Sequence, residues 1–482
     1  AGVSITFTAA RSRYSRPTLD DRLADPGLLS LGAFLSVSAA LLVPIVLYLG
    51  GAAPLARILY PAMALFLGGF LYLHRSPWYI GYTILLFCFA SLVRRLADYQ
   101  GGFQVSSLIL TAPYLICMLG AFSALRYLAP GRNPYTGPFL AILCSIAYGA
   151  LLAVLQDRFM LGMTDLLKWA SGPLLAIHIL SQWQRGAAMR QVITSTLLVV
   201  APVMGIYGLM QFIYPTPWDA EWVNNVRLLG FDSVGVPGAF SLRVFSTMNA
   251  PGSMAAYLMI ALLIAMSRSF SISVPVMIAC ALGLALAQYR TLWGATSLGL
   301  VLLLLWGTPQ EKMRISLGAI VLVFSAGFLA LIPEMQFALE QRLNSLSSLN
   351  SDASGAERMM QYVRFFIDND NLLIGDGFGL NYYASVSGSA NAVVDSGILD
   401  SVRALGIFGG AFYFISLFML ILSTFQSDPT PGSKLYLYRV LVIIAFIQIP
   451  LGAVHIAEVG VLNWIMLATA LTFTASRVRM AS

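Results

Sequence analysis

Charge is scarce in this sequence: Asp, Glu, Lys and Arg make up 10% of its 482 residues, while 58% are hydrophobic. A water-soluble domain needs more charge than this on its surface, so the composition excludes a soluble globular protein. The apolar runs cover almost the whole chain and are too long and too uniform for outer-membrane strands. Because backbone polar groups find no water in lipid, we expect an all-α, polytopic bundle of transmembrane helices.

Cysteine and histidine are also rare, with four and three residues. The four cysteines all stand inside apolar runs without metal-type spacing: Cys88, Cys117, Cys144 and Cys280. We interpret them as small apolar residues rather than disulfide partners. Dense groups of carboxylates are missing as well, and Asp368 and Asp370 in IDNDN are interpreted as a solvated turn. The sequence therefore predicts neither a metal site nor a cofactor.

Basic residues outnumber acidic ones by 28 to 21, which gives a net charge of +7. Nucleic-acid binding would be one explanation of this charge. In a membrane protein, arginines in cytoplasmic loops explain it better. We therefore expect the lipid bilayer, and no nucleic acid, as a partner.

Fourteen apolar segments have about the length that crosses a bilayer. They are residues 28–50, 55–73, 78–93, 105–125, 138–156, 164–183, 191–214, 248–267, 271–288, 291–307, 315–333, 398–424, 438–453 and 457–475. The first run is too long for the core of a signal peptide and has no obvious cleavage site, so we interpret it as a spanning helix. About fourteen helices are expected.

The basic residues of the short loops predict the orientation. With the N-terminus in the cytoplasm, 16 of the 28 basic residues fall inside, four in the N-terminal segment and twelve in the loops and the C-terminal tail. Segments 1–27 and 476–482 are then cytoplasmic, and helices occupy 28–333 and 398–475. Two long segments, 215–247 and the partly helical periplasmic loop 334–397, lie outside. These two are the non-membrane stretches large enough to build a site.

Seven arginines break the positive-inside pattern on the outer side: Arg227, Arg243, Arg290, Arg342, Arg358, Arg364 and Arg403. Arg243 stands in SLRVFSTMNAPGS, before a helix that starts near Pro251, and Arg290 stands in the tight turn AQYRTLWG. The planar guanidinium matches phosphate oxygens, so the set suits a lipid-linked diphosphate. For any single arginine, the alternative is snorkelling to headgroups or a salt bridge with Asp232 or Glu221.

The stretch IGDGFGLNYY, residues 374–383, carries three alternating glycines: Gly375, Gly377 and Gly379. Such a loop lets a backbone approach a phosphate, but the strand, helix and lysine of nucleotide loops are missing here. The alternative is a re-entry turn in which glycine permits positive φ. Asp395 and Arg403, which follow, lie on about the same helical face at a helix entrance and are expected to face a cavity. Alternatively, Asp395 or Ser396 caps that helix.

The order and spacing of these motifs resemble the O-antigen ligase and Wzy-type polysaccharide polymerase superfamily, membrane glycosyltransferases of bacterial inner membranes. RVFSTMNAPGS (243–253) is similar to the family's Arg-x-Phe-Gly-x-Phe-x-x-Pro-Asn pattern, and YRT around Arg290 to its Ser-Arg helix junction. NLLIGDGFG is similar to its Gly-x-Gly-x-Gly segment, and DSGILDSVRALGIFGG to its His-Asn-x-x-Leu segment. The resemblance covers about 170 residues, and the rest is similar in hydropathy alone.

The resemblance implies an oligosaccharide on undecaprenyl diphosphate as donor and acceptor, used on the periplasmic face without metal and with inversion. Arg243, Arg290 and Arg358 would hold the diphosphate, and Arg403 and the glycines of 375–379 would contact diphosphate or glycan.

The catalytic base is a separate question, because the family's ligases have a histidine where this chain has Asp395. Either Asp395 replaces that histidine, or His455 or Glu458 in GAVHIAEVG acts instead, or no strong base is needed.

Three functions fit such a chain. A polymerase of lipid-linked repeat units is favoured, because the family histidine of the ligases is missing; a chain-length regulator and export proteins are partners that this function allows. A ligase that transfers glycan to lipid A core or protein is the alternative. A transporter or flippase is the third, but the middles of the spans are nearly free of acids and bases, which favours an outward-facing enzyme. A non-catalytic scaffold is the remaining alternative.

Overall fold

The computed structural model describes residues 26–129, 134–230, 234–268, 270–329, 331, 333, 336, 360, 362–367, 371–380, 396–426 and 434–478. Every regular element in these ranges is helical, and their single extended pairing is an isolated bridge between Gly235 and Leu242. The described part of the chain is therefore all-α, as the composition predicts.

The helices are spaced along the chain as follows. The first half contains α2 (Pro26–Val37), η1 (Ser38–Leu42), α3 (Val43–Leu49), η2 (Ala53–Leu55), α4 (Ala56–Leu73), α5 (Trp78–Gly101), η3 (Leu108–Thr111), α6 (Ala112–Cys117), α7 (Gly120–Tyr127), α8 (Thr136–Leu155), α9 (Phe159–Ser181), η4 (Trp183–Arg185), α10 (Gly186–Ile213) and α11 (Pro217–Leu228). The second half contains α12 (Pro251–Met266), α13 (Phe270–Ala287), α14 (Arg290–Trp306), α15 (Pro309–Leu329), α19 (Gly397–Ser423), α20 (Leu435–Phe446), η6 (Ile449–Leu451) and α21 (Ala457–Val478).

Each of the fourteen predicted spans coincides with one helix or with consecutive helical pieces. Seven described helices are long and apolar enough to cross a membrane: Leu31–Leu49, Ala53–Leu73, Trp78–Gly101, Leu108–Tyr127, Thr136–Leu155, Trp183–Ile213 and Gly397–Ser423. Five more are apolar but shorter: Pro251–Met266, Ser273–Ala287, Arg290–Trp306, Leu435–Leu451 and Ala457–Phe473. These helices indicate a membrane-embedded bundle, and the crossing of all fourteen stays a prediction.

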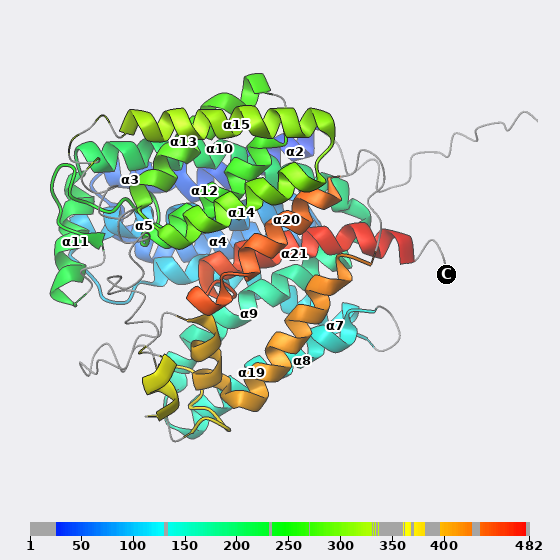
Figure 1. Cartoon of the computed structure of the whole chain (residues 1–482). Helices are drawn as coiled ribbons and strands as arrows, with labels where there is room; N and C mark the ends of the chain where they lie inside the picture. Colours follow the sequence, from blue (N-terminus) through cyan, green and yellow to red (C-terminus); the bar gives the residue numbers. More distant parts are fainter. Residues whose placement is uncertain are drawn as a thin grey trace, which may run out of the picture.

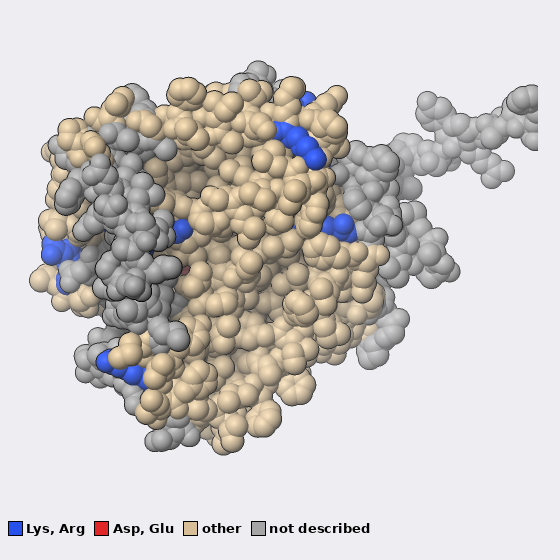
Figure 2. Space-filling model, in the orientation of Figure 1, with Lys and Arg blue, Asp and Glu red and all other residues tan. Residues whose placement is uncertain are grey.

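Large apolar side chains cover the outside of the bundle. Phe66 of α4, Phe324 of α15 and Phe412 of α19 are 81%, 74% and 65% exposed. On the face drawn in Figure 2, the described residues carry little charge, and their few lysines and arginines lie near its edges or in a hollow. An apolar surface of this extent is costly in water and suits contact with lipid.

The bundle has two ends, which we call the α11 end and the C-terminal end. In Figure 1, α11 lies at the left and the last turns of α21 lie at the right. The turn after α4 belongs to the C-terminal end, where Arg185 donates to the backbone oxygen of Arg75 at 2.7 Å. At the α11 end, Gln100 of α5 donates to the backbone oxygen of Tyr48 of α3 at 2.8 Å. In the predicted topology, the α11 end is periplasmic.

The two predicted outer segments are described to different extents. Segment 215–247 contains α11 and a small apolar cluster of its own: Trp222, Val223, Val226, Val234, Leu242 and Phe245. Most of segment 334–397 falls outside the described residues, so its predicted place stays a prediction. The four cysteines, all described, are free; Cys144 is exposed and the other three are buried.

An arginine-lined cavity at the α11 end

A cavity of about 480 Å³ at the α11 end is lined by both Arg243 and Arg290. Its other walls come from the start of α12, from the turn between α13 and α14, and from the connection between η6 and α21. Two of the three arginines that the resemblance assigns to the diphosphate therefore line one cavity, Arg243 ahead of α12 and Arg290 at the start of α14. We call it the arginine cavity.

Arg243 is tied to the turn that carries Arg290. Its Nη2 donates to the backbone oxygen of Gln288 at 3.4 Å, a long hydrogen bond. Gln288 has a φ of 50°, which L-residues seldom adopt, and it begins the turn between α13 and α14. The backbone N–H of Arg243 donates to Val234 at 3.0 Å. The guanidinium groups of Arg243 and Arg290 are thus presented from neighbouring backbone segments.

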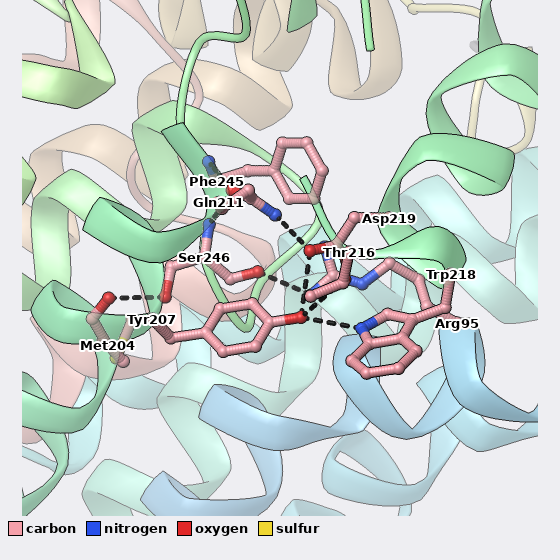
Figure 3. A network of polar contacts seen from close by, with 9 residues as sticks. All are labelled: Arg95, Met204, Tyr207, Gln211, Thr216, Trp218, Asp219, Phe245 and Ser246. Atoms are coloured by element: carbon pink, nitrogen blue, oxygen red, sulfur yellow. Dashed lines mark hydrogen bonds and ion pairs between the residues drawn. The ribbon is translucent and has the colours of Figure 1, made fainter. Parts of the chain in front are cut away.

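A strained residue fixes the segment that follows Arg243. Ser246 has a φ of 53°, which costs about 1 kcal/mol or more for a residue with a side chain. Its N–H donates to the side-chain oxygen of Gln211 at 2.9 Å, its hydroxyl donates to Met204 at 2.6 Å, and its carbonyl accepts from Arg95. Figure 3 shows these contacts converging on Ser246, two on its backbone and one on its hydroxyl. Three interactions therefore hold the strained backbone that leads from Arg243 to α12.

Arg95 and Asp219 form a buried ion pair beneath this segment. Arg95 Nη1 lies 3.2 Å from Asp219 Oδ1, an ion pair by distance rather than an aligned hydrogen bond, and both side chains are 0% exposed. Asp219 Oδ2 accepts from Gln211 at 2.8 Å and from Tyr207 at 2.9 Å (Figure 3). The network thus joins α5, α10, α11 and the segment after Arg243. The sequence did not predict this network, although the pair Arg94–Arg95 at a helix end was a signal.

Glu458, a predicted base, is held by hydroxyl groups beside the arginine cavity. Ser253, which lines the cavity, donates to its Oε1 at 2.6 Å, and Tyr114 donates to its Oε2 at 3.0 Å. Tyr257 donates to its backbone oxygen at 3.1 Å. Among the described residues, Glu458 has no ion pair. Its carboxylate can therefore take up a proton without first breaking a salt bridge.

His455, another predicted base, lies in the turn before α21 and is 0% exposed. Three rings surround its imidazole at 5.0 to 5.5 Å: Trp169, Tyr413 and Phe414. Its Nε2 lies 3.1 Å from the Ser401 hydroxyl, which donates its own proton to Gly397 at 2.6 Å, so Nε2 carries the hydrogen. Burial lowers the pKa of His455 to about 3. The ring is neutral and does not line the arginine cavity.

The glycine loop, residues 375–379, has all its backbone N–H groups hydrogen-bonded within the protein. The N–H groups of residues 375 to 378 donate to backbone oxygens of Asn371, Arg403, Ala404 and Gly149, and that of Gly379 donates to the Asp165 carboxylate at 2.8 Å. The three glycines have φ of 83°, 75° and 88°. No amide from 375 to 379 is left for a phosphate in this conformation. A substrate contact of these glycines stays a prediction.

The same glycines allow close packing of three helices. A Cβ on Gly375 would come within 2.2 Å of the backbone of α19, and a Cβ on Gly377 within 2.8 Å of the backbone of α8. A Cβ on Gly379 would come within 3.0 Å of the backbone of α9. The structure thus gives the loop the role of a turn that joins α8, α9 and α19.

Arg403 lies on the other side of the turn that holds His455. It lines a small cavity of about 60 Å³ together with Asp165, Lys168, Gly377 and Asp400. Ile456 lines this small cavity, whereas Val454 lines the arginine cavity. The two cavities therefore lie on either side of the turn that holds His455. The structure does not bring Arg403 into the arginine cavity.

Two further predicted residues, Asp395 and Arg358, lie outside the described residues, as do Asp368 and Asp370. Ser396 is the N-cap of α19, and its hydroxyl accepts from the Leu399 N–H at 3.5 Å. The cap is thus supplied by Ser396, which leaves the role of Asp395 a prediction.

Among the described residues, no group of three or more His, Cys, Asp or Glu is placed to hold a metal ion. Comparison of this chain with protein-family models, with curated proteins and with solved structures gave no match.

Proposed function

We propose that this protein is a membrane glycosyltransferase that polymerises undecaprenyl-diphosphate-linked oligosaccharide units into a surface polysaccharide on the periplasmic face of a bacterial inner membrane. The observation that supports it most is the arginine cavity. Two guanidinium groups, from segments far apart in the sequence, line a single hollow at one end of an apolar bundle. Permanently charged, planar donors of this kind suit a diphosphate at the membrane surface.

In the proposed reaction, a hydroxyl of the acceptor sugar attacks the anomeric carbon of the donor. The bond from that carbon to the diphosphate oxygen breaks, and the electron pair leaves with the diphosphate. Arg243 and Arg290 stabilise the charge that develops there. A single displacement inverts the anomeric centre. The diphosphate is already a good leaving group, so the proposal includes no metal and no cofactor.

The acceptor proton needs a base, and we assign it to Glu458. Of the predicted candidates in the described structure, Glu458 is hydrogen-bonded to the cavity wall through Ser253, whereas His455 is enclosed by aromatic rings. A sugar hydroxyl that takes the place of the Ser253 hydroxyl would donate directly to the carboxylate. General-base catalysis by a positioned group contributes roughly 10²- to 10⁴-fold.

A bacterium that carries this gene tests the function. Deletion should abolish the long glycan ladder on gels and leave single repeat units, and the wild-type gene should restore the ladder. A full-length polymer that is merely unattached to its final acceptor would show the ligase activity instead. An unchanged polysaccharide profile after deletion would contradict both activities.

A further inference from the structure

A second cavity, of about 390 Å³, lies at the C-terminal end of the bundle. It is formed by the end of α4, by α7 and by the end of α9, and it shares no lining residue with the arginine cavity. We call it the lower cavity. The proposed reaction does not use it.

Two arginines line the lower cavity. Arg75 and Arg126 are exposed, and neither guanidinium has a hydrogen bond or ion pair with another described residue. Arg75 has a φ of 51°, and its carbonyl is held by Arg185 at 2.7 Å. The backbone thus adopts a rarely populated conformation where it presents one of the two charges. Two uncompensated cations at one hollow favour an anionic ligand.

A chain of side chains at the cavity wall supplies a further donor. Gln182 Nε2 lies 2.9 Å from His178 Nε2, His178 Nδ1 lies 2.8 Å from Ser123 Oγ, and Ser123 Oγ lies 2.9 Å from the Tyr72 hydroxyl. An amide nitrogen donates and never accepts, so with this amide orientation Gln182 donates to His178 and His178 donates to Ser123. Either hydroxyl can donate in the hydrogen bond between Ser123 and Tyr72; when Ser123 donates, the Tyr72 hydroxyl can donate its own proton to a ligand, and Tyr72 lines the cavity.

The rim of the lower cavity is apolar. Leu73 and Phe122, both lining residues, are 77% and 61% exposed. Leu125, on the same helix as Phe122 and three residues further, is 81% exposed. Cationic and hydroxyl donors inside, with exposed apolar side chains at the rim, match a phosphate group that carries acyl chains.

We propose that the lower cavity binds the phosphate of an anionic phospholipid, with Arg75 and Arg126 contacting the phosphate oxygens and Leu73 and Phe122 contacting the acyl chains. The site lies at the opposite end of the bundle from the arginine cavity and does not depend on the transferase activity. The same donors would also bind free phosphate, so the test distinguishes a phospholipid from a free phosphate ion.

The test uses the full chain, purified in detergent, with Arg75→Gln/Arg126→Gln as the variant. Arg268→Gln/Lys312→Gln is the matched control: it removes the same charge from exposed residues, neither of which lines the cavity. Native mass spectrometry counts retained phosphatidylglycerol and phosphatidylcholine, with and without inorganic phosphate as competitor.

We expect wild type and control to retain phosphatidylglycerol over phosphatidylcholine. The Arg75/Arg126 variant should bind phosphatidylglycerol at least about tenfold more weakly, because it loses the charged hydrogen bonds of both arginines. If phosphatidylglycerol stays bound in millimolar phosphate, the ligand is the phospholipid. If phosphate displaces it, the cavity is a site for free phosphate. Equal retention of both lipids by all three proteins, or equal loss in variant and control, would overturn the proposal.

Discussion

Ser253 at the start of α12 donates a 2.6 Å hydrogen bond to Glu458 at the start of α21, across 205 residues of sequence. The contact connects the wall of the arginine cavity to a carboxylate with no ion pair among the described residues. This relationship distinguishes Glu458 from His455, only three residues earlier. Spacing in the sequence could not make that distinction.

Glu458→Gln should lower polymer synthesis by about 10²-fold, because the amide keeps the shape but cannot accept a proton. Ser253→Ala should have a smaller effect, since the carboxylate remains. Polymer yield at matched membrane expression measures both. A Glu458→Gln variant with normal yield, beside an inactive Asp395→Asn variant, would move the base to Asp395.

Asp219→Asn should destabilise the protein by about 3–5 kcal/mol, because it leaves the charge of the fully buried Arg95 without its partner. Lys168→Met is the comparison, since it breaks a pair whose lysine side chain is 43% exposed. That change should cost less than about 1 kcal/mol. Thermal unfolding midpoints in detergent measure both, and equal midpoints for the two variants would show that the buried pair contributes little.

Because His455 is buried and neutral, we predict that the folded protein loses stability in acid. Its pKa is about 3 in the folded protein and about 6.5 when exposed, so the unfolded chain binds more protons between these values. Its contribution is therefore fully present above pH 6.5 and declines as the pH falls toward 3. His455→Phe, which removes the titrating group, should flatten the decline in melting temperature between about pH 7 and pH 4.5. Identical slopes for both proteins would show that other groups cause it.

The predicted orientation can be measured with introduced cysteines in a Cys144→Ser background, which removes the exposed native thiol. Leu228 at the end of α11 is 85% exposed, and His74 is exposed after α4. Leu228→Cys should react with an impermeant maleimide in intact spheroplasts, and His74→Cys only after lysis. The reverse pattern would invert the topology.

Hydropathy predicts the helices well, because each spanning segment must be apolar whatever its neighbours are. It fails at the end of the third span, which we expected to stop at residue 93 but which continues to Gly101. Arg94 and Arg95 are tolerated there because Asp98 and Asp219 neutralise them at 3.2 Å inside the protein. That compensation depends on tertiary contacts, which a hydropathy profile does not contain.

The sequence predicts only part of the candidate site, because the rest also depends on tertiary contacts. The tight turn at Arg290 and the motif at Arg243 signalled charged residues at one end of the bundle, and both line one cavity. The glycine loop carried a phosphate-like pattern, but its amides are bonded within the protein and its glycines serve helix packing. Alternating glycines indicate that another group approaches the backbone closely, but they do not tell whether that group belongs to a ligand or to a helix.

The binding of undecaprenyl diphosphate to the purified protein tests the central claim most directly. Arg290→Ala and Arg243→Ala should each weaken binding by about 3 kcal/mol, roughly two decades, and Arg290→Lys should restore only part of it, because lysine lacks the planar fork. Arg364→Ala is the control, an exposed arginine that does not line the cavity. Wild-type affinity in both cavity variants would show that these arginines contact lipid headgroups and that the cavity is not a diphosphate site.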